Sequence, residues 1–245
     1  MVTIEVCIDS VASAINAERG GAQRVELCDN LFEGGTTPSA GCIAVVRQQI
    51  AIGLQVIIRP RGGDFLYDDL EFAMMKHDIQ VAKDQGADGV VIGLLTPQGR
   101  IDRDRTHQLI ELARPMNVTF HRAFDMTADP FQALDDLIEL GVERILTSGQ
   151  KATAWEGVSL IEELVKRAAD RVIIMPGGGI NEGNIAALVQ QTKVSECHVS
   201  GRKTINSGME HRNYDAFMGG VLRLPEYERK ITDAERIQGF KRQLS

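Results

Sequence analysis

Short apolar segments alternate with longer amphipathic segments along most of the chain. The apolar segments are four to six residues long and rich in β-branched residues, which is typical of strands buried in a parallel sheet. The predicted strands are Thr3–Ile8, Arg24–Cys28, Leu54–Arg59, Gly89–Leu94, Asn117–His121, Glu143–Thr147, Arg171–Met175 and Glu196–Ser200.

The segments between these strands have apolar residues at helical spacing and carry helix start and stop signals. Ser10 precedes one helix as an N-cap, and Asp129-Pro130 begins another that Gly141 ends. The predicted helices are Val11–Arg19, Ala40–Gln49, Asp68–Gln85, Arg103–Ala113, Pro130–Leu140, Leu160–Ala169 and Asn184–Gln190. Strict strand–helix alternation predicts an α/β fold, a single-domain (β/α)8 TIM barrel over residues 1–245, in preference to a doubly wound open sheet.

Residues 202–245 depart from this alternation. We expect a C-terminal loop followed by a helix from the Thr232–Glu235 capping-box pattern to Leu244. A helix that closes the barrel is favoured over an extension used in assembly.

Composition narrows the class of protein. The 245 residues are 43% hydrophobic and 25% charged, with a formal net charge of −7, which argues against a nucleic-acid partner. No apolar run approaches the roughly 18 residues of a membrane span, so no membrane partner is expected. The first residues lack the features of a signal peptide, and the four cysteines form no CxxC pair. A cytoplasmic protein with reduced thiols is therefore expected.

Alternation along the strands places polar side chains inside the predicted barrel. With the apolar residues facing the helices, the inward positions include Glu5, Cys7, Glu26 and His198, together with Cys28, Arg59, His121 and Ser200 at the carboxyl ends of their strands. A purely structural barrel would fill this space with branched aliphatic side chains. Buried charges must be paired, and Glu26 with Arg59 or His121 is the expected network. A functional pocket is favoured over a structural network.

Four residues are candidates for catalysis. His121 stands at a strand end, with Asp125 four residues later in a position to orient its ring. Glu26 is the second candidate for proton transfer, and Arg59 would orient an anionic substrate. The alternative for His121 is a structural role, which is commoner for a single histidine.

Glycines and arginines in the predicted loops suggest an anion site. Gly177, Gly178 and Gly179 follow the seventh strand, and Gly201 and Arg202 follow the eighth. Such loops bind phosphate in many barrels, because glycine lets backbone N–H groups approach an anion. Arg61 could assist, although salt bridges to neighbouring carboxylates are an equal alternative for it. The alternative is that the glycines only turn the chain.

Cys7 and Cys28 form a candidate metal site. They lie on adjacent strands and both point inward, so their thiolates could bind a soft ion such as Cu(I). Their spacing does not fit a structural zinc motif. The alternative is that both are free cysteines packed as small apolar residues.

Several motifs together resemble the CutC family over essentially the whole chain. They are Val6–Ser10, Glu18–Ala22, Val25–Cys28, Glu33–Ser39, Ile58–Phe65, Thr119–Asp125, Ile145–Gly149 and Pro176–Gly179. The resemblance implies a cytoplasmic (β/α)8 barrel, a role in copper homeostasis and a homodimer. It also implies that Cys7 and Cys28 match the family's candidate Cu(I) ligands.

Two main hypotheses follow, with a non-catalytic scaffold as a third that leaves the polar interior unexplained. The first is a copper homeostasis protein that binds Cu(I) directly or acts on copper indirectly. The alternative is an enzyme acting on a small anionic or phosphorylated substrate at the barrel mouth. The sequence leaves open whether the protein is an enzyme at all.

Overall fold

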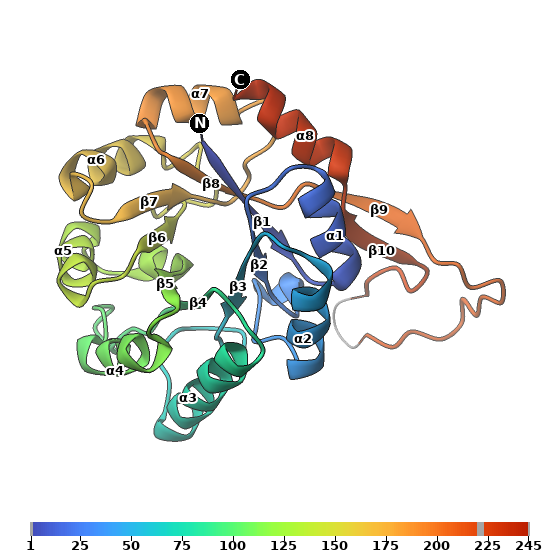
Figure 1. Ribbon diagram of the computed structural model, residues 1–245, viewed down its shortest axis with the longest axis horizontal. Coiled ribbons are helices and arrows are strands. Elements are labelled where there is room, and N and C mark those ends of the chain that lie inside the picture. The colour runs from blue at the N-terminus through green and yellow to red at the C-terminus, as the bar shows by residue number, and fades with distance from the viewer. Residues whose placement is uncertain (1, 220–222, 245) are drawn as a thin grey trace.

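The computed structural model describes residues 2–219 and 223–244. Eight parallel strands form the wall of a barrel, viewed almost along its axis in Figure 1. They are β1 (Thr3–Ile8), β2 (Arg24–Leu27), β3 (Gly53–Ile57), β4 (Gly89–Ile92), β5 (Asn117–Phe120), β6 (Arg144–Thr147), β7 (Ile173–Pro176) and β8 (Glu196–Val199). The predicted (β/α)8 architecture is confirmed.

Helices surround the strands as an outer ring. Within the described residues they are α1 (Val11–Arg19), α2 (Ala40–Gln49), α3 (Asp69–Asp84), α4 (Arg103–Ala113), α5 (Pro130–Leu140), α6 (Val158–Ala168), α7 (Ile185–Thr192) and α8 (Ala234–Gln243). Local signals explain their ends, since the Ser10 side chain accepts from the Ser13 amide and Gly141 ends α5 in the left-handed region. Two short 3-10 helices, η1 (Leu31–Glu33) and η2 (Arg122–Met126), follow β2 and β5.

The barrel closes between β7 and β8 through one parallel bridge, from Gly177 to His198. Elsewhere each strand pairs with its sequence neighbour, and β8 pairs with β1. A Cβ at Gly177 would lie 2.6 Å from Leu146 Cδ1 and 3.2 Å from His198 Cβ. Glycine is therefore required for the close approach that brings β8 to the seam.

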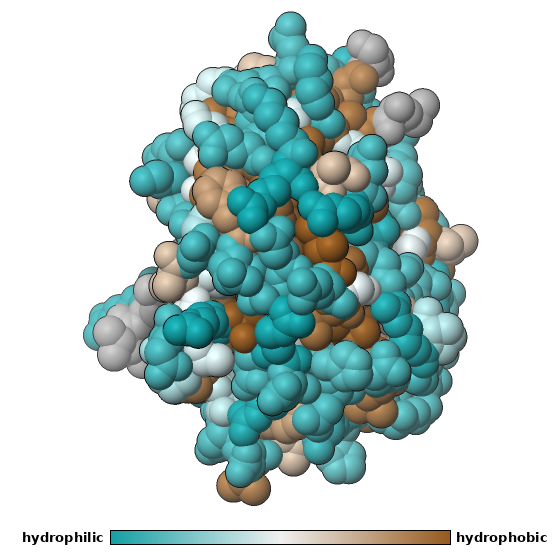
Figure 2. Space-filling model, turned by 90° about the vertical axis from the view of Figure 1, so that its left-hand side faces the viewer, coloured by the Kyte–Doolittle hydropathy of each residue, from teal (hydrophilic) through white to brown (hydrophobic). Residues whose placement is uncertain are grey.

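The main core lies between strands and helices. The outward-facing strand residues are fully buried in this core, for example Ile4, Val6, Leu27 and Val56. The predicted alternation of inward and outward side chains is thus confirmed for β1, β2 and β3. The outer face over α4 to α6 is mostly hydrophilic, with hydrophobic side chains showing between the polar ones (Figure 2).

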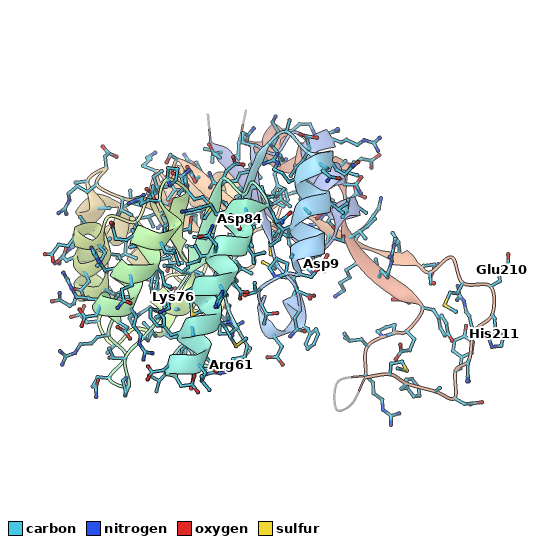
Figure 3. All side chains as sticks on the ribbon, turned by 60° about the horizontal axis from the view of Figure 1, so that its bottom comes forward. Asp9, Arg61, Lys76, Asp84, Glu210 and His211 are labelled. Atoms are coloured by element: carbon cyan, nitrogen blue, oxygen red, sulfur yellow. The ribbon has the colours of Figure 1, made fainter. Side chains whose placement is uncertain are left out.

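The C-terminal segment differs from the expected loop. β9 (Arg202–Asn206) and β10 (Glu228–Thr232) pair as an antiparallel hairpin. The hairpin and its connection extend away from the barrel, with Glu210 and His211 at the far end (Figure 3). The last helix, α8, has Asp233 as its N-cap, because the Asp233 side chain accepts a hydrogen bond from the Glu235 amide. The predicted N-cap at Thr232 is wrong, because Thr232 is the last residue of β10 and pairs with Arg202. No helix in the described part of the chain is long and apolar enough to cross a membrane.

Candidate functional site

A cavity of about 510 Å³ opens at the carboxyl ends of the barrel strands. Its walls come from β1, β2 and β8 on one side and from the loops after β3, β5 and β7 on the other. The lining includes Cys7, Glu26, Arg59, His121 and Arg202, so these sequence-selected positions do meet at one pocket.

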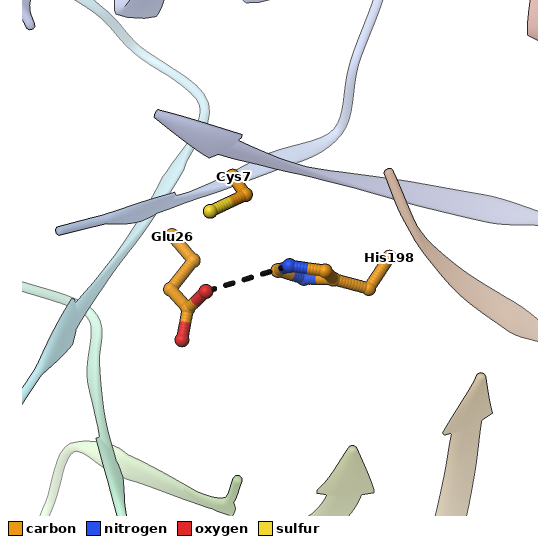
Figure 4. Close-up of side chains that lie close together, drawn as sticks. All are labelled: Cys7, Glu26 and His198. Atoms are coloured by element: carbon orange, nitrogen blue, oxygen red, sulfur yellow. Dashed lines mark ion pairs between the residues drawn. The ribbon is translucent and has the colours of Figure 1, made fainter. Parts of the chain in front are cut away.

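Cys7, Glu26 and His198 form a compact group inside the barrel (Figure 4). One potential ligand atom from each residue lies within 4.8 Å of the other two, and His198 Nε2 is 3.5 Å from Glu26 Oε2. The strand register explains the grouping, because Cys7 is opposite Glu26 on β2 and Glu5 is opposite His198 on β8. The group is therefore built by three adjacent strands.

A second set of charges supports this group from the other end of the barrel. Glu5 Oε1 lies 2.8 Å from His198 Nδ1, and Glu5 Oε2 accepts from Arg24. Arg24 also donates to Glu196, whose Oε2 accepts from Arg144 Nε at 2.8 Å. The carboxylates are thus paired with guanidinium groups, as buried charges require.

Glu5 and His198 are charged as a pair. Burial alone would raise the pKa of Glu5, but the charge of Arg24 and the bond to His198 lower it to about 2. Burial would lower the pKa of His198, but its contacts with Cys7, Glu5 and Glu26 raise that pKa well above the ordinary value. These contacts favour the protonated, imidazolium form of His198.

The two thiols are in different protonation states. Cys7 Sγ lies 4.0 Å from Cys28 Sγ. The hydrogen bond with Cys28 lowers the pKa of Cys7, against the effect of burial and with help from His198. The same contact and burial raise the pKa of Cys28, and burial raises the pKa of Glu26 to about 8. At neutral pH the pocket thus presents one thiolate beside a protonated carboxyl.

Arg59 does not form the expected pair with Glu26. Its Nη1 donates to the carbonyls of Glu33 and Gly35 at 2.8 Å, and its Nη2 donates to the carbonyl of Gly63 at 2.9 Å. These bonds connect the strand end to η1 and to the following loop. The expectation that Glu26 pairs with Arg59 or His121 is wrong, because the basic side chain that pairs with Glu26 is His198, with Nε2 3.5 Å from Glu26 Oε2.

His121 is buried and neutral. Its Nδ1 accepts from the Ala123 amide at 3.1 Å, and burial together with the charge of Arg59 lowers its pKa to about 3. Asp125 does not orient this ring, which corrects that expectation. The carboxylate of Asp125 instead accepts from Thr147 Oγ1 at 2.5 Å and from the Ser148 amide at 3.0 Å.

Arg122 is a cavity residue that the sequence patterns did not indicate, unlike Arg202. Arg122 begins η2, lines the cavity and bonds Asp125 Oδ2 at 2.8 Å. Its position directly after His121 at a strand end was the available signal. His198 was placed inside the barrel from the alternation but received no role, because only the register shows that Glu5 and Glu26 flank it.

The predicted anion residues divide into two groups. Gly178, Gly179 and Arg202 line the cavity. Gly177 and Gly201 are not part of its lining, and a Cβ at Gly201 would meet Ile237 Cδ1 at 2.6 Å. Arg61 also lies outside the cavity and forms salt bridges to neighbouring carboxylates, the alternative considered for it. Its Nε donates to Glu71 at 2.5 Å and its Nη1 donates to Asp64 at 3.2 Å.

The donor set at Cys7 and Cys28 fits a soft metal ion. A metal–thiolate bond is roughly 2.3 Å long. The sulfur–sulfur distance of 4.0 Å is shorter than two such bonds, so one ion can contact both sulfurs. Thiolates favour Cu(I), and His198 Nε2 and the Glu26 carboxyl lie in the same group as further donors, each of which must first lose its proton to bind an ion.

Comparisons with known proteins agree on one family. The model of the CutC family matches residues 2–203. The human "copper homeostasis protein cutC homolog" is 51% identical over 235 residues, which are 96% of this chain and 86% of that protein. A CutC family protein of Chromobacterium violaceum is 50% identical over 241 residues, covering 98% of this chain and 97% of that protein.

Solved structures support the same relationship. The crystal structure of a CutC protein from Streptococcus agalactiae is 37% identical, with a TM-score of 0.78 over 82% of this chain and 99% of that chain. A thiamine phosphate pyrophosphorylase from Pyrococcus furiosus is 15% identical with a TM-score of 0.62, which shows a shared fold alone.

Proposed function

The chain belongs to the CutC family, and from this premise we propose that it is a copper homeostasis protein that binds Cu(I) through Cys7 and Cys28. The observation that carries the proposal is the 4.0 Å distance between the sulfur of Cys7, which lines the cavity, and the sulfur of Cys28, which is buried behind it. Two thiols this close, one with a lowered pKa, offer a soft ion a preformed pair of ligands. His198 and Glu26 are the additional donors nearest to this pair.

Anaerobic titration with Cu(I) against a competing chelator tests this proposal. The parent is expected to bind one ion tightly, and the Cys7→Ser/Cys28→Ser variant is expected to lose that binding. The matched control is Cys42→Ser, because Cys42 lies on α2 outside the cavity and its loss should leave binding unchanged. Equal Cu(I) affinity in the parent and the double variant would contradict a direct role.

The proposal includes a cytoplasmic location and a homodimer. Support for the location comes from the free cysteines Cys7, Cys28, Cys42 and Cys197, since unpaired thiols are typical of a reducing compartment. The homodimer follows the family resemblance alone. Light scattering coupled to size-exclusion chromatography would measure it, and a mass near the 26.9 kDa of one chain would contradict it.

A further inference from the structure

Arg122 reaches the cavity from η2 with its guanidinium held in place by the protein. Its Nε donates to Asp125 at 2.8 Å, and its Nη2 donates to Ser148 Oγ at 2.5 Å and to the Lys151 carbonyl at 3.3 Å. Nη1 has no acceptor among the described residues. A rigid guanidinium with an unused donor at a pocket wall is preorganised for an oxyanion.

The backbone of Gly178 and Gly179 faces the same part of the cavity. Their φ angles are +95° and +71°, in the left-handed region that favours glycine. A Cβ at Gly178 would lie 3.4 Å from Arg122 Nη1, so the main chain here comes close to the guanidinium. In the part of the chain that the structure describes, the amides of both glycines donate to no protein acceptor. They are free to donate to a ligand.

Arg202 adds a second guanidinium from the start of β9. The carboxylate oxygen with which it pairs, Asp9 Oδ2, is 3.8 Å from its Nη1, which is too long for a hydrogen bond. Arg202 and Ser200 line the cavity together with Gly178 and Gly179. The loops after β5, β7 and β8 thus contribute positive charge or free donors to one pocket.

Two buried side chains in the lining each leave one nitrogen without a hydrogen-bond partner among the described residues. Arg59 is 5% exposed; its Nη1 and Nη2 donate to carbonyls, its guanidinium lies beside the Tyr67 hydroxyl and the Phe65 ring, and its Nε has no acceptor. His121 is 4% exposed, and its Nε2 has no partner. Because Nδ1 accepts from the Ala123 amide and the ring is neutral, the hydrogen is on Nε2. Buried donors without acceptors are costly, so both favour oxygen atoms in the cavity.

We propose that this cavity binds a small phosphate monoester whose phosphate is held by Arg122, Arg202 and the amides of Gly178 and Gly179. The organic part carries oxygen acceptors and extends toward Arg59 and His121. A phosphate is favoured over a carboxylate because its three terminal oxygens and higher charge match donors that arrive from three separate loops. The volume of about 510 Å³ is within the usual range for small-molecule pockets. None of the proposed phosphate ligands is a thiol, so phosphate binding does not require bound copper, although Cys7 lines the same cavity.

Thermal unfolding of the metal-free, full-length protein with glycerol 3-phosphate, inorganic phosphate or glycerate, at constant ionic strength, tests the proposal. The two phosphates are expected to raise the unfolding midpoint saturably, whereas glycerate should not. Arg122→Gln and Arg202→Gln should each weaken the apparent affinity for glycerol 3-phosphate roughly tenfold or more, as loss of a charge-assisted contact predicts.

The matched control is Arg61→Gln, because Arg61 lies near the same end of the barrel but bonds Glu71 and Asp64 outside the cavity. It should retain the parent's response, and so should Cys7→Ser/Cys28→Ser, which separates this result from the copper titration. If Arg122→Gln does not fold, as circular dichroism would show, Arg202→Gln decides. The proposal is overturned by the absence of a saturable phosphate effect, by an equal effect of glycerate, or by an equal loss in Arg61→Gln and Arg202→Gln.

Discussion

His198 Nδ1 lies 2.8 Å from Glu5 Oε1, across the junction of β8 and β1. Glu5 is itself bonded to Arg24, so one carboxylate connects the charge network at the lower end of the barrel to the imidazolium beside Cys7. The protonation state of the pocket thiol therefore depends on a residue that does not line the pocket.

Replacing Glu5 is expected to change the reactivity of Cys7. In Glu5→Gln the imidazolium of His198 loses its negative partner, its pKa falls, and Cys7 loses a positive neighbour. The pKa of Cys7 should then rise, while the hydrogen bond with Cys28, the largest cause of its lowered value, remains. Alkylation by iodoacetamide at a series of pH values, followed by mass spectrometry of each cysteine, measures the shift.

Cys42 serves as the internal reference for this experiment, because it lies on α2 away from the cavity. Its alkylation profile should be the same in the parent and in Glu5→Gln. An unchanged Cys7 profile in a variant with the parent's circular dichroism would refute the coupling.

Loss of Arg24 should destabilise the barrel strongly. Arg24 bonds both Glu5 and Glu196, and Arg24→Met would leave these buried carboxylates without their shared partner. Breaking a buried ion pair in this way costs about 3–5 kcal/mol. Urea denaturation measures the free energy of unfolding. The control is Lys166→Met, which removes an exposed pair with Glu162 and should leave stability unchanged; similar losses in both variants would contradict the prediction.

His121 should make the protein less stable in mild acid. Its pKa is about 3 in the folded state and near 6.5 in the unfolded state, so between these values only the unfolded chain binds the proton. Stability from this group is present above pH 6.5 and falls with decreasing pH, by about 1.4 kcal/mol per pH unit at most. Glu26 acts in the opposite direction, because its pKa is raised to about 8 in the folded state.

The measurement is therefore a difference between the parent and His121→Asn, whose side-chain oxygen can still accept from the Ala123 amide. Urea denaturation at pH 6.5 and pH 5 should show that the parent loses about 2 kcal/mol more than the variant. The matched substitution His77→Asn, on the exposed side of α3, should keep the parent's pH dependence. Parallel losses in the parent and His121→Asn would disprove burial of a neutral His121.

Two glycine substitutions should have opposite effects on stability. A Cβ at Gly93 would lie 2.4 Å from His121 Nδ1 and 2.8 Å from Ala123 Cβ, so Gly93→Ala should cost about 1–3 kcal/mol by overpacking. Gly41 lies within α2 with nothing within 4 Å of its added Cβ. Gly41→Ala should stabilise the protein by about 0.5–1 kcal/mol. Thermal unfolding measures both, and a neutral Gly93→Ala would show that β4 and His121 are not closely packed.

The tail shows where local sequence signals were insufficient. β9 and β10 are polar segments with little apolar alternation, and the two are separated by 21 residues, from 207 to 227. Their pairing depends on contacts between distant segments, so the sequence suggested only a loop. The start of α8 illustrates the same limit. Both Thr232 and Asp233 are residue types favoured at a helix N-cap, and Asp233 takes that position because Thr232 is the last paired residue of β10.

The sequence by itself determined the barrel, its strand–helix order and which side chains of β1, β2 and β3 face inward, because the two-residue period of a strand and the 3.6-residue period of a helix are local properties. The tertiary structure alone decided which inward residues meet. Glu26 faces His198 and not Arg59, and Arg59 faces carbonyl groups of η1, because strand register and loop conformation set distances across the barrel. The same long-range geometry placed Cys7 beside Cys28 and brought Arg122 to Gly178, and no local pattern in the chain encodes those distances.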